Sequence, residues 1–163
     1  TNELEIIELY IAEAGAGGMV LGFLIGHGEV DGPLIAELVS DGTWPWTFHR
    51  ALDACLDSNR AWAVLPSLPR LDQVLTAGSA RGVEHGLGDL LARAKADPWA
   101  AAMMMAGGGL AAEHVPWLVR AGVRAFHIGS AARPGGSFKA YVDEPLVRSW
   151  RALIDDEIGH ARA

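Results

Sequence analysis

The chain has 163 residues, a formal net charge of −7 and one cysteine, and half of its residues are hydrophobic. This length fits one domain with its own core, so we expect a single domain over residues 1–163. The acidic balance argues against nucleic-acid partners, and the longest apolar run, Trp99–Ala106, is too short to span a membrane. The acidic start Thr1–Glu5 differs from a secretory signal, and the lone Cys55 indicates a reducing cytoplasm.

Helical and strand patterns alternate along the chain. An amphipathic helix that carries Leu4, Ile7 and Ile11 on one face is expected first, and Gly15 can end it. Five apolar segments follow at intervals of roughly 25 to 30 residues, the length of a strand–helix unit. Because these segments are apolar almost throughout, they predict a parallel sheet that is covered on both faces. The expected strands are Met19–Ile25, Trp44–His49, Gln73–Ala77, Ala101–Ala106 and Arg124–Gly129.

Helical patterns separate and follow these strands. Pro33 suits the first turn of one helix, and Asp57 or Ser58 can cap the next, which Pro66 and Pro69 cut short. Five such units cannot close an eight-stranded barrel, so the pattern fits either an open doubly wound sheet or an incomplete barrel. The later helices are marked by Leu87–Ala94, Val115–Val119 and, after a flexible loop at Arg133–Ser137, Glu144–Asp156 with Leu146, Val147, Trp150, Leu153 and Ile154 inward.

Polar side chains follow the second expected strand. Alternation along it places Thr47 and His49 on one face and Phe48 and Arg50 on the other. A histidine beside an arginine and a carboxylate can act as a general acid or base, or can bind an anion. The alternative is that Arg50 and Asp53 form a structural ion pair at the rim of the sheet. His49, Arg50 and Asp53 are therefore the candidate catalytic residues.

The later strands end in glycine-bearing turns. Glycines in such turns let backbone amides approach an anion, and barrels often bind phosphate after their seventh and eighth strands. Turn geometry alone is the alternative reading. At the middle strand, Thr76 and Ser79 can contact a ligand or cap the next helix, and capping is favoured. The candidate ligand-binding residues are Thr76, Gly78, Gly107, Gly108, Gly109, His127, Gly129 and Ser130.

Metal-ligand patterns are sparse in this sequence. The run Met103–Met105 offers thioethers to Cu(I), but strand alternation turns the middle sulfur away from the other two and favours core packing. Cys55 is the one candidate metal ligand, and the alternative for it is an inert buried thiol. No CxxC, HExxH or P-loop motif is present, and His27, His85, His114 and His160 show no ligand spacing.

Four segments, taken together, resemble the CutC copper homeostasis family. They are Thr47–Asp53, Leu75–Gly78, Met105–Gly109 and His127–Ala131, in that order and spacing. The resemblance implies a TIM (β/α)8 barrel, of which this chain carries the last helix of the third unit and then units four to eight. We therefore expect an α/β fold that is an incomplete TIM barrel, with exposed outer strands that a homo-oligomer or another partner covers.

The resemblance also implies a cytosolic role in copper homeostasis and the binding of Cu(I). It places the copper ligands chiefly on cysteines in the portion that is missing here, so they do not transfer to this chain. Ser79 and His114 depart from the family pattern, which more often has glycine or glutamine and asparagine at these places. Two other functions remain open: an inactive partial product, or an enzyme for a small phosphorylated or carboxylated substrate, with His49 as acid or base and Arg50 as anion ligand.

Overall fold

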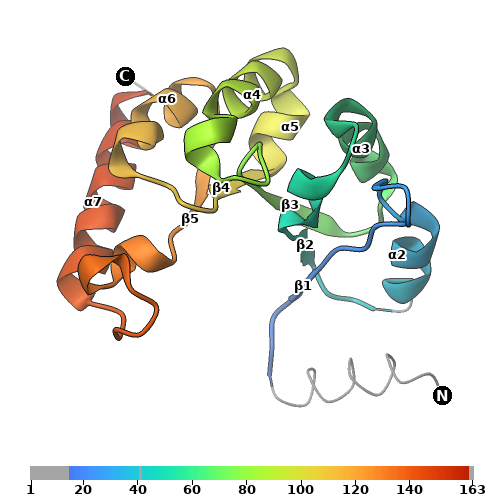
Figure 1. Ribbon diagram of the computed structural model, residues 1–163, viewed down its shortest axis with the longest axis horizontal. Coiled ribbons are helices and arrows are strands. Elements are labelled where there is room, and N and C mark those ends of the chain that lie inside the picture. The colour runs from blue at the N-terminus through green and yellow to red at the C-terminus, as the bar shows by residue number, and fades with distance from the viewer. Residues whose placement is uncertain (1–14, 41, 162–163) are drawn as a thin grey trace. The chain divides into compact units, whose positions relative to one another are not determined.

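The computed structural model describes residues 15–40 and 42–161 (Figure 1). The expected opening helix with Leu4, Ile7 and Ile11 lies outside these residues. The described strands form one parallel sheet in the order β1-β2-β3-β4-β5, flanked by helices, so the expected α/β class is confirmed and is compatible with an incomplete TIM barrel. The chain divides into two compact units, Thr1–Val74 and Leu75–Ala163.

Aspartate caps organise the helices of the first unit. The Asp31 side chain accepts from the Leu34 amide (3.1 Å) and the Asp57 side chain from the Arg60 amide (3.0 Å), so the second cap is Asp57 and not Ser58. The core of this unit contains Ile35, Trp46, Phe48, Trp62, Leu65 and Val74. Its elements are β1 (Met19–Leu21), α2 (Gly32–Leu38), β2 (Trp46–Phe48), η1 (Arg50–Ala54), α3 (Ser58–Val64), η2 (Leu65–Ser67) and most of β3 (Leu71–Thr76).

In the second unit, helices pack around the last two strands (Figure 1). Helix α4 contacts α5, α6 and β4, while α7 contacts α6 and η4. Its elements are α4 (Val83–Ala96), α5 (Pro98–Met103), β4 (Met104–Gly107), η3 (Ala112–His114), α6 (Val115–Arg120), β5 (Ala125–His127), η4 (Ser130–Ala132), η5 (Pro134–Gly136) and α7 (Glu144–His160). Its core contains Val83, Leu90, Met104, Ala106, Val115, Leu118 and Val123. None of the helices within the described residues is long and apolar enough to cross a membrane.

The sequence prediction is wrong at the start of β4 and at one position of α7. The segment Ala101–Met103 ends helix α5 and does not start a strand, because Asp97 caps that helix through the Trp99 amide (2.9 Å) and Pro98 occupies its first turn. The methionine run therefore crosses from a helix into β4, where Met104 is fully buried. On α7, Val147 was expected to face inward but is 44% exposed.

The start of α4 lies against the end of β3 with almost no space between the two backbones. A Cβ added to Gly86 would lie 2.0 Å from the Ala77 carbonyl oxygen, and one on Gly78 would lie 2.5 Å from the Gly86 carbonyl oxygen. Gly78 also has a φ of +72°, which side-chain-bearing residues rarely adopt. Glycine at both positions thus fixes the loop that follows β3.

Candidate functional site

His49 is the first polar residue after β2, and it caps the short helix η1. Its Nδ1 accepts a hydrogen bond from the Ala51 amide (3.1 Å), and its ring meets Phe48 edge-on with centroids 6.2 Å apart. A Cβ on Gly22 would lie 2.8 Å from the same Nδ1, so only glycine leaves room for the ring there. The imidazole is therefore held between the end of β1 and the start of η1.

The Ala51 hydrogen bond determines which proton His49 can offer. Because Nδ1 accepts, the neutral ring carries its hydrogen on Nε2, and this tautomer is assigned from the hydrogen bond. His49 can then donate to a ligand through Nε2. It cannot serve as a base at Nε2 without losing the Ala51 bond, so the predicted catalytic role is narrowed to that of a donor.

Arg50 and Asp53 form the ion pair that the sequence offered as an alternative. Arg50 Nε lies 2.7 Å from Asp53 Oδ2, with the aspartate side chain 2% exposed and the arginine side chain 36% exposed. Strand alternation does not place Arg50 as expected, because β2 ends at Phe48 and η1 begins at Arg50. The pair holds η1 together, and catalysis by these two residues stays a prediction.

Cys55 ends η1, and its thiol points back toward the Ala51 carbonyl oxygen (Sγ–O 3.9 Å). Burial raises the pKa of the Cys55 thiol, and the negative charge of Asp53 raises it further. The thiolate is the form that binds metals, so this shift works against metal binding at Cys55.

Thr76 and Ser79 organise the loop after β3 and do not cap α4. The buried Thr76 accepts from the Gly78 amide (3.0 Å), and the Ser79 hydroxyl accepts from the Arg81 amide (3.1 Å). Helix α4 begins beyond them, with Gly82 as its N-cap and no side-chain cap. The favoured prediction of helix capping is therefore wrong, while ligand binding by Thr76 and Gly78 stays a prediction.

The ends of β4 and β5 lie side by side in the second unit. The two strands pair in parallel with Gly107 opposite His127, and a Cβ on Gly107 would lie 2.7 Å from the His127 Cβ. Gly108 and Gly109 follow with φ values of +98° and +76°. The structure thus brings Gly107, Gly108, Gly109, His127, Gly129 and Ser130 to one end of this strand pair.

Two donors at this end have no protein partner among the described residues. The Ser130 hydroxyl is half-buried and the Gly109 amide is exposed, and neither makes a hydrogen bond within the described loops. Consecutive amides in a turn with left-handed glycines can form a concave set of donors that suits an anion. The arrangement is therefore chemically suited to bind a small oxyanion.

A group of potential metal ligands that the sequence did not reveal lies between α4 and η3. Ligand atoms of Glu84, Glu113 and His114 lie within 4.8 Å of one another. Glu84 and His114 are 30 positions apart, so no local spacing marks them, and only the fold brings His114 Nε2 to 3.1 Å from Glu84 Oε2. Nitrogen and carboxylate donors suit divalent ions better than Cu(I).

The hydrogen bonds of His114 assign it a structural role. Its Nδ1 accepts from the Ala111 amide (3.0 Å), so the neutral ring carries its hydrogen on Nε2 and points it at Glu84. A metal on Nε2 would need that position deprotonated. The buried His114 thus links α4 to the start of α6.

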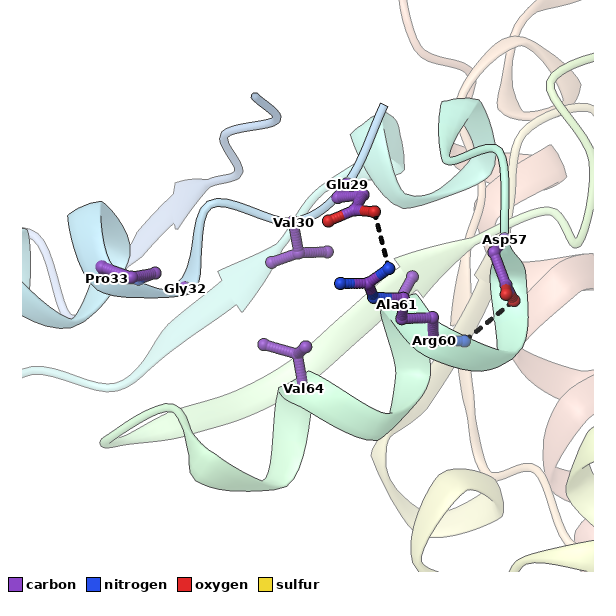
Figure 2. A pocket seen from close by; sticks show the side chains of 8 residues that line it. All are labelled: Glu29, Val30, Gly32, Pro33, Asp57, Arg60, Ala61 and Val64. Carbon is purple, nitrogen blue, oxygen red and sulfur yellow. Dashed lines mark hydrogen bonds and ion pairs between the residues drawn. The ribbon is translucent and has the colours of Figure 1, made fainter. Parts of the chain in front are cut away.

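A small pocket lies in the first unit, between one side of α3 and the segment that leads into the start of α2 (Figure 2). Figure 2 shows Arg60 reaching from α3 to Glu29, with Nη1 2.9 Å from Oε1. The cavity of about 190 Å³ is smaller than most ligand sites, and its arginine is already neutralised. No predicted site residue lines it; the lining residues are Glu29, Val30, Gly32, Pro33, Asp57, Arg60, Ala61 and Val64.

Comparison with known proteins agrees with the resemblance seen in the sequence. The model of the CutC family matches residues 1–132. A protein of Klebsiella pneumoniae (strain 342) named family protein CutC is 34% identical over 121 residues, which cover 72% of this chain and 47% of that protein. A protein of the same name from Yersinia pestis (strain Pestoides F) is 33% identical over 148 residues, which cover 86% of this chain and 56% of that protein. The chain spans about half the length of these curated relatives, and it belongs to the CutC family.

Proposed function

We propose that the chain shares the role in copper homeostasis that its family resemblance implies. We also propose, separately, that it binds a small phosphorylated or carboxylated molecule at the ends of β4 and β5. The observation that carries the proposal is the pairing of Gly107 with His127, which places two glycine-bearing turns side by side. The site would take an oxyanion on the amides of these turns and on the Ser130 hydroxyl. The sequence has one cysteine and so cannot form a disulfide within the chain, which supports a location in the reducing cytoplasm.

Anions are expected to stabilise the chain through this site. Inorganic phosphate and glycerol 3-phosphate should raise the thermal midpoint relative to chloride at equal ionic strength, because a ligand that binds the folded state shifts unfolding by mass action. Gly109→Ala should remove most of the rise: its Cβ meets nothing within 4 Å, but alanine resists the φ of +76° that aims the amide.

Gly88→Ala is the matched control, since this exposed glycine lies within α4 and its Cβ also meets nothing. An equal rise for phosphate and chloride in the unchanged chain would contradict the proposal. If phosphate raises the thermal midpoint of Gly109→Ala as much as that of the unchanged chain, the anion does not bind at the Gly107–Gly109 turn.

Family membership favours a second candidate, the binding of Cu(I) by the chain itself. Cys55 is the only cysteine in the sequence. The raised pKa of its thiol disfavours the thiolate, which is the form that binds a metal. In a competition titration of the reduced chain against a Cu(I) chelator, the first candidate predicts that no stoichiometric copper stays on the protein. Retention of one Cu(I) per chain, with loss in Cys55→Ser, would instead establish the second candidate.

Catalysis and assembly belong to the proposal as well. His49 would donate a proton through Nε2, with Arg50 and Asp53 shaping η1 around it.

In the strand order, β1 and β5 are the outer strands, and unpaired strand edges favour association with another chain. We therefore propose a homo-oligomer, which size-exclusion chromatography with light scattering would test; a monomer at all concentrations would contradict it.

A further inference from the structure

Arg133 is fixed in place directly after the end of β5. Its amide donates to the Ser130 carbonyl oxygen (3.0 Å), and its Nη1 donates to the Ala140 carbonyl oxygen. Its guanidinium carbon lies 5.7 Å from the centre of the Phe138 ring, within the range of a cation–π contact. Two contacts therefore hold this side chain and a third holds its backbone, although the sequence suggested only a flexible loop.

The guanidinium of Arg133 has not found an anionic partner within the described residues. Its Nε is buried and makes no hydrogen bond, and no carboxylate there pairs with it. By contrast, Arg50, Arg60, Arg148 and Arg151 each pair with a carboxylate. Arg70, in the first unit, is the other described arginine with buried guanidinium nitrogens that make no hydrogen bond. A donor left without an acceptor carries a desolvation cost, so a fixed, unpaired arginine is a feature that calls for an acceptor.

The stacked pair adjoins the turn that follows β5. A Cβ on Gly129 would lie 3.5 Å from the edge of the Phe138 ring, so the ring covers this glycine. The local charge is also favourable: residues 129–143 contain Arg133, Lys139 and Asp143, which sum to +1 in a chain of net charge −7. The Asp143 carboxylate is already used to cap α7 through the Leu146 amide (2.9 Å).

We propose that Arg133 is the charged ligand of the anion site at the end of β5, and that it selects a phosphoryl group. This inference rests on the proposed function and deepens it, because the turns offer neutral donors and Arg133 adds the positive charge that a doubly charged phosphate needs. A planar guanidinium matches two phosphate oxygens at once, and the cation–π contact with Phe138 helps to hold it in place. The family match ends at residue 132, so it does not cover this arginine.

Calorimetric titration of the full chain with inorganic phosphate tests this assignment. Arg133→Gln should weaken binding about tenfold or more, because charge-assisted bonds to phosphate are lost, while Arg133→Lys should weaken it less. Arg120→Gln is the matched control: Arg120 also stacks on an aromatic ring, with its guanidinium carbon 5.5 Å from the Trp117 centre, but it belongs to α6. Its affinity should stay within about twofold of the unchanged chain.

The possible failures are distinguishable. Phosphate binding that is equal in the unchanged chain and Arg133→Gln would overturn the role of Arg133 and leave the anion site standing. No phosphate binding by the unchanged chain would overturn both. If Arg133→Gln does not fold, Phe138→Leu replaces it: Phe138 is 74% exposed, and loss of its stack should weaken phosphate binding about threefold. Full affinity in both Phe138→Leu and Arg133→Lys would also overturn the assignment.

Discussion

Gly86→Ala is expected to destabilise the chain by about 3 kcal/mol or more, a large share of the stability of a typical domain. The added Cβ would lie 2.0 Å from the Ala77 carbonyl oxygen and 2.7 Å from the Ser79 nitrogen. These are backbone atoms that no side-chain rotation can move aside. Helix α4 would have to separate from the end of β3, which would displace the loop carrying Thr76 and Gly78.

Urea unfolding followed by circular dichroism measures this effect, and Gly88→Ala is the control in the same helix. Gly88 is exposed and its Cβ would meet nothing within 4 Å, so alanine should stabilise α4 by about 0.5–1 kcal/mol. Similar unfolding midpoints for the two variants would show that α4 does not lie against β3 as described.

Trp46→Ala should cost about 3–5 kcal/mol in the free energy of unfolding. Trp46 starts β2, is 1% exposed, and donates from its indole nitrogen to the Pro69 carbonyl oxygen (2.8 Å). Its loss leaves a large cavity beneath β2, the strand that ends just before His49. The segment Thr47–Asp53, which carries part of the family resemblance, therefore depends on the buried Trp46 for its position.

Two further tryptophan variants separate the contributions. Trp46→Phe keeps most of the ring but loses the hydrogen bond to Pro69, and should cost about 1–3 kcal/mol. Trp117→Ala removes a tryptophan that is 55% exposed and should cost under about 1 kcal/mol. Equal losses for Trp46→Ala and Trp117→Ala would contradict the burial of β2.

The sequence was informative wherever one local rule decides the structure. All five strands were expected at the right places because buried parallel strands are apolar almost throughout, and Asp57 and Pro33 marked helix starts. Strand ends were less exact, because apolar alanines and methionines before β4 also suit a helix once Asp97 and Pro98 start one. The adjacency of the ends of β4 and β5 followed from the expected order of parallel strands, whereas the register that pairs Gly107 with His127 was not predicted.

Contacts between distant segments were not predictable in the same way. Glu84 contacts His114 only because α4 and η3 pack together. Gly86 must be glycine only because the Ala77 backbone lies against it. Arg133 lay in a segment of proline and glycines that indicates a loop, and the stack on Phe138 that orders it has no sequence signature. The tautomer of His49 likewise depends on one backbone amide.

The central claim, an anion site at the ends of β4 and β5, is tested most directly by amide NMR of the labelled chain during a phosphate titration. The account predicts saturable shifts that are largest at Gly108, Gly109, Gly129 and Ser130, with the exposed control Gly88 unmoved. Shifts centred on the Glu29–Arg60 pocket or on His49–Asp53, or no saturable shift at all, would contradict it.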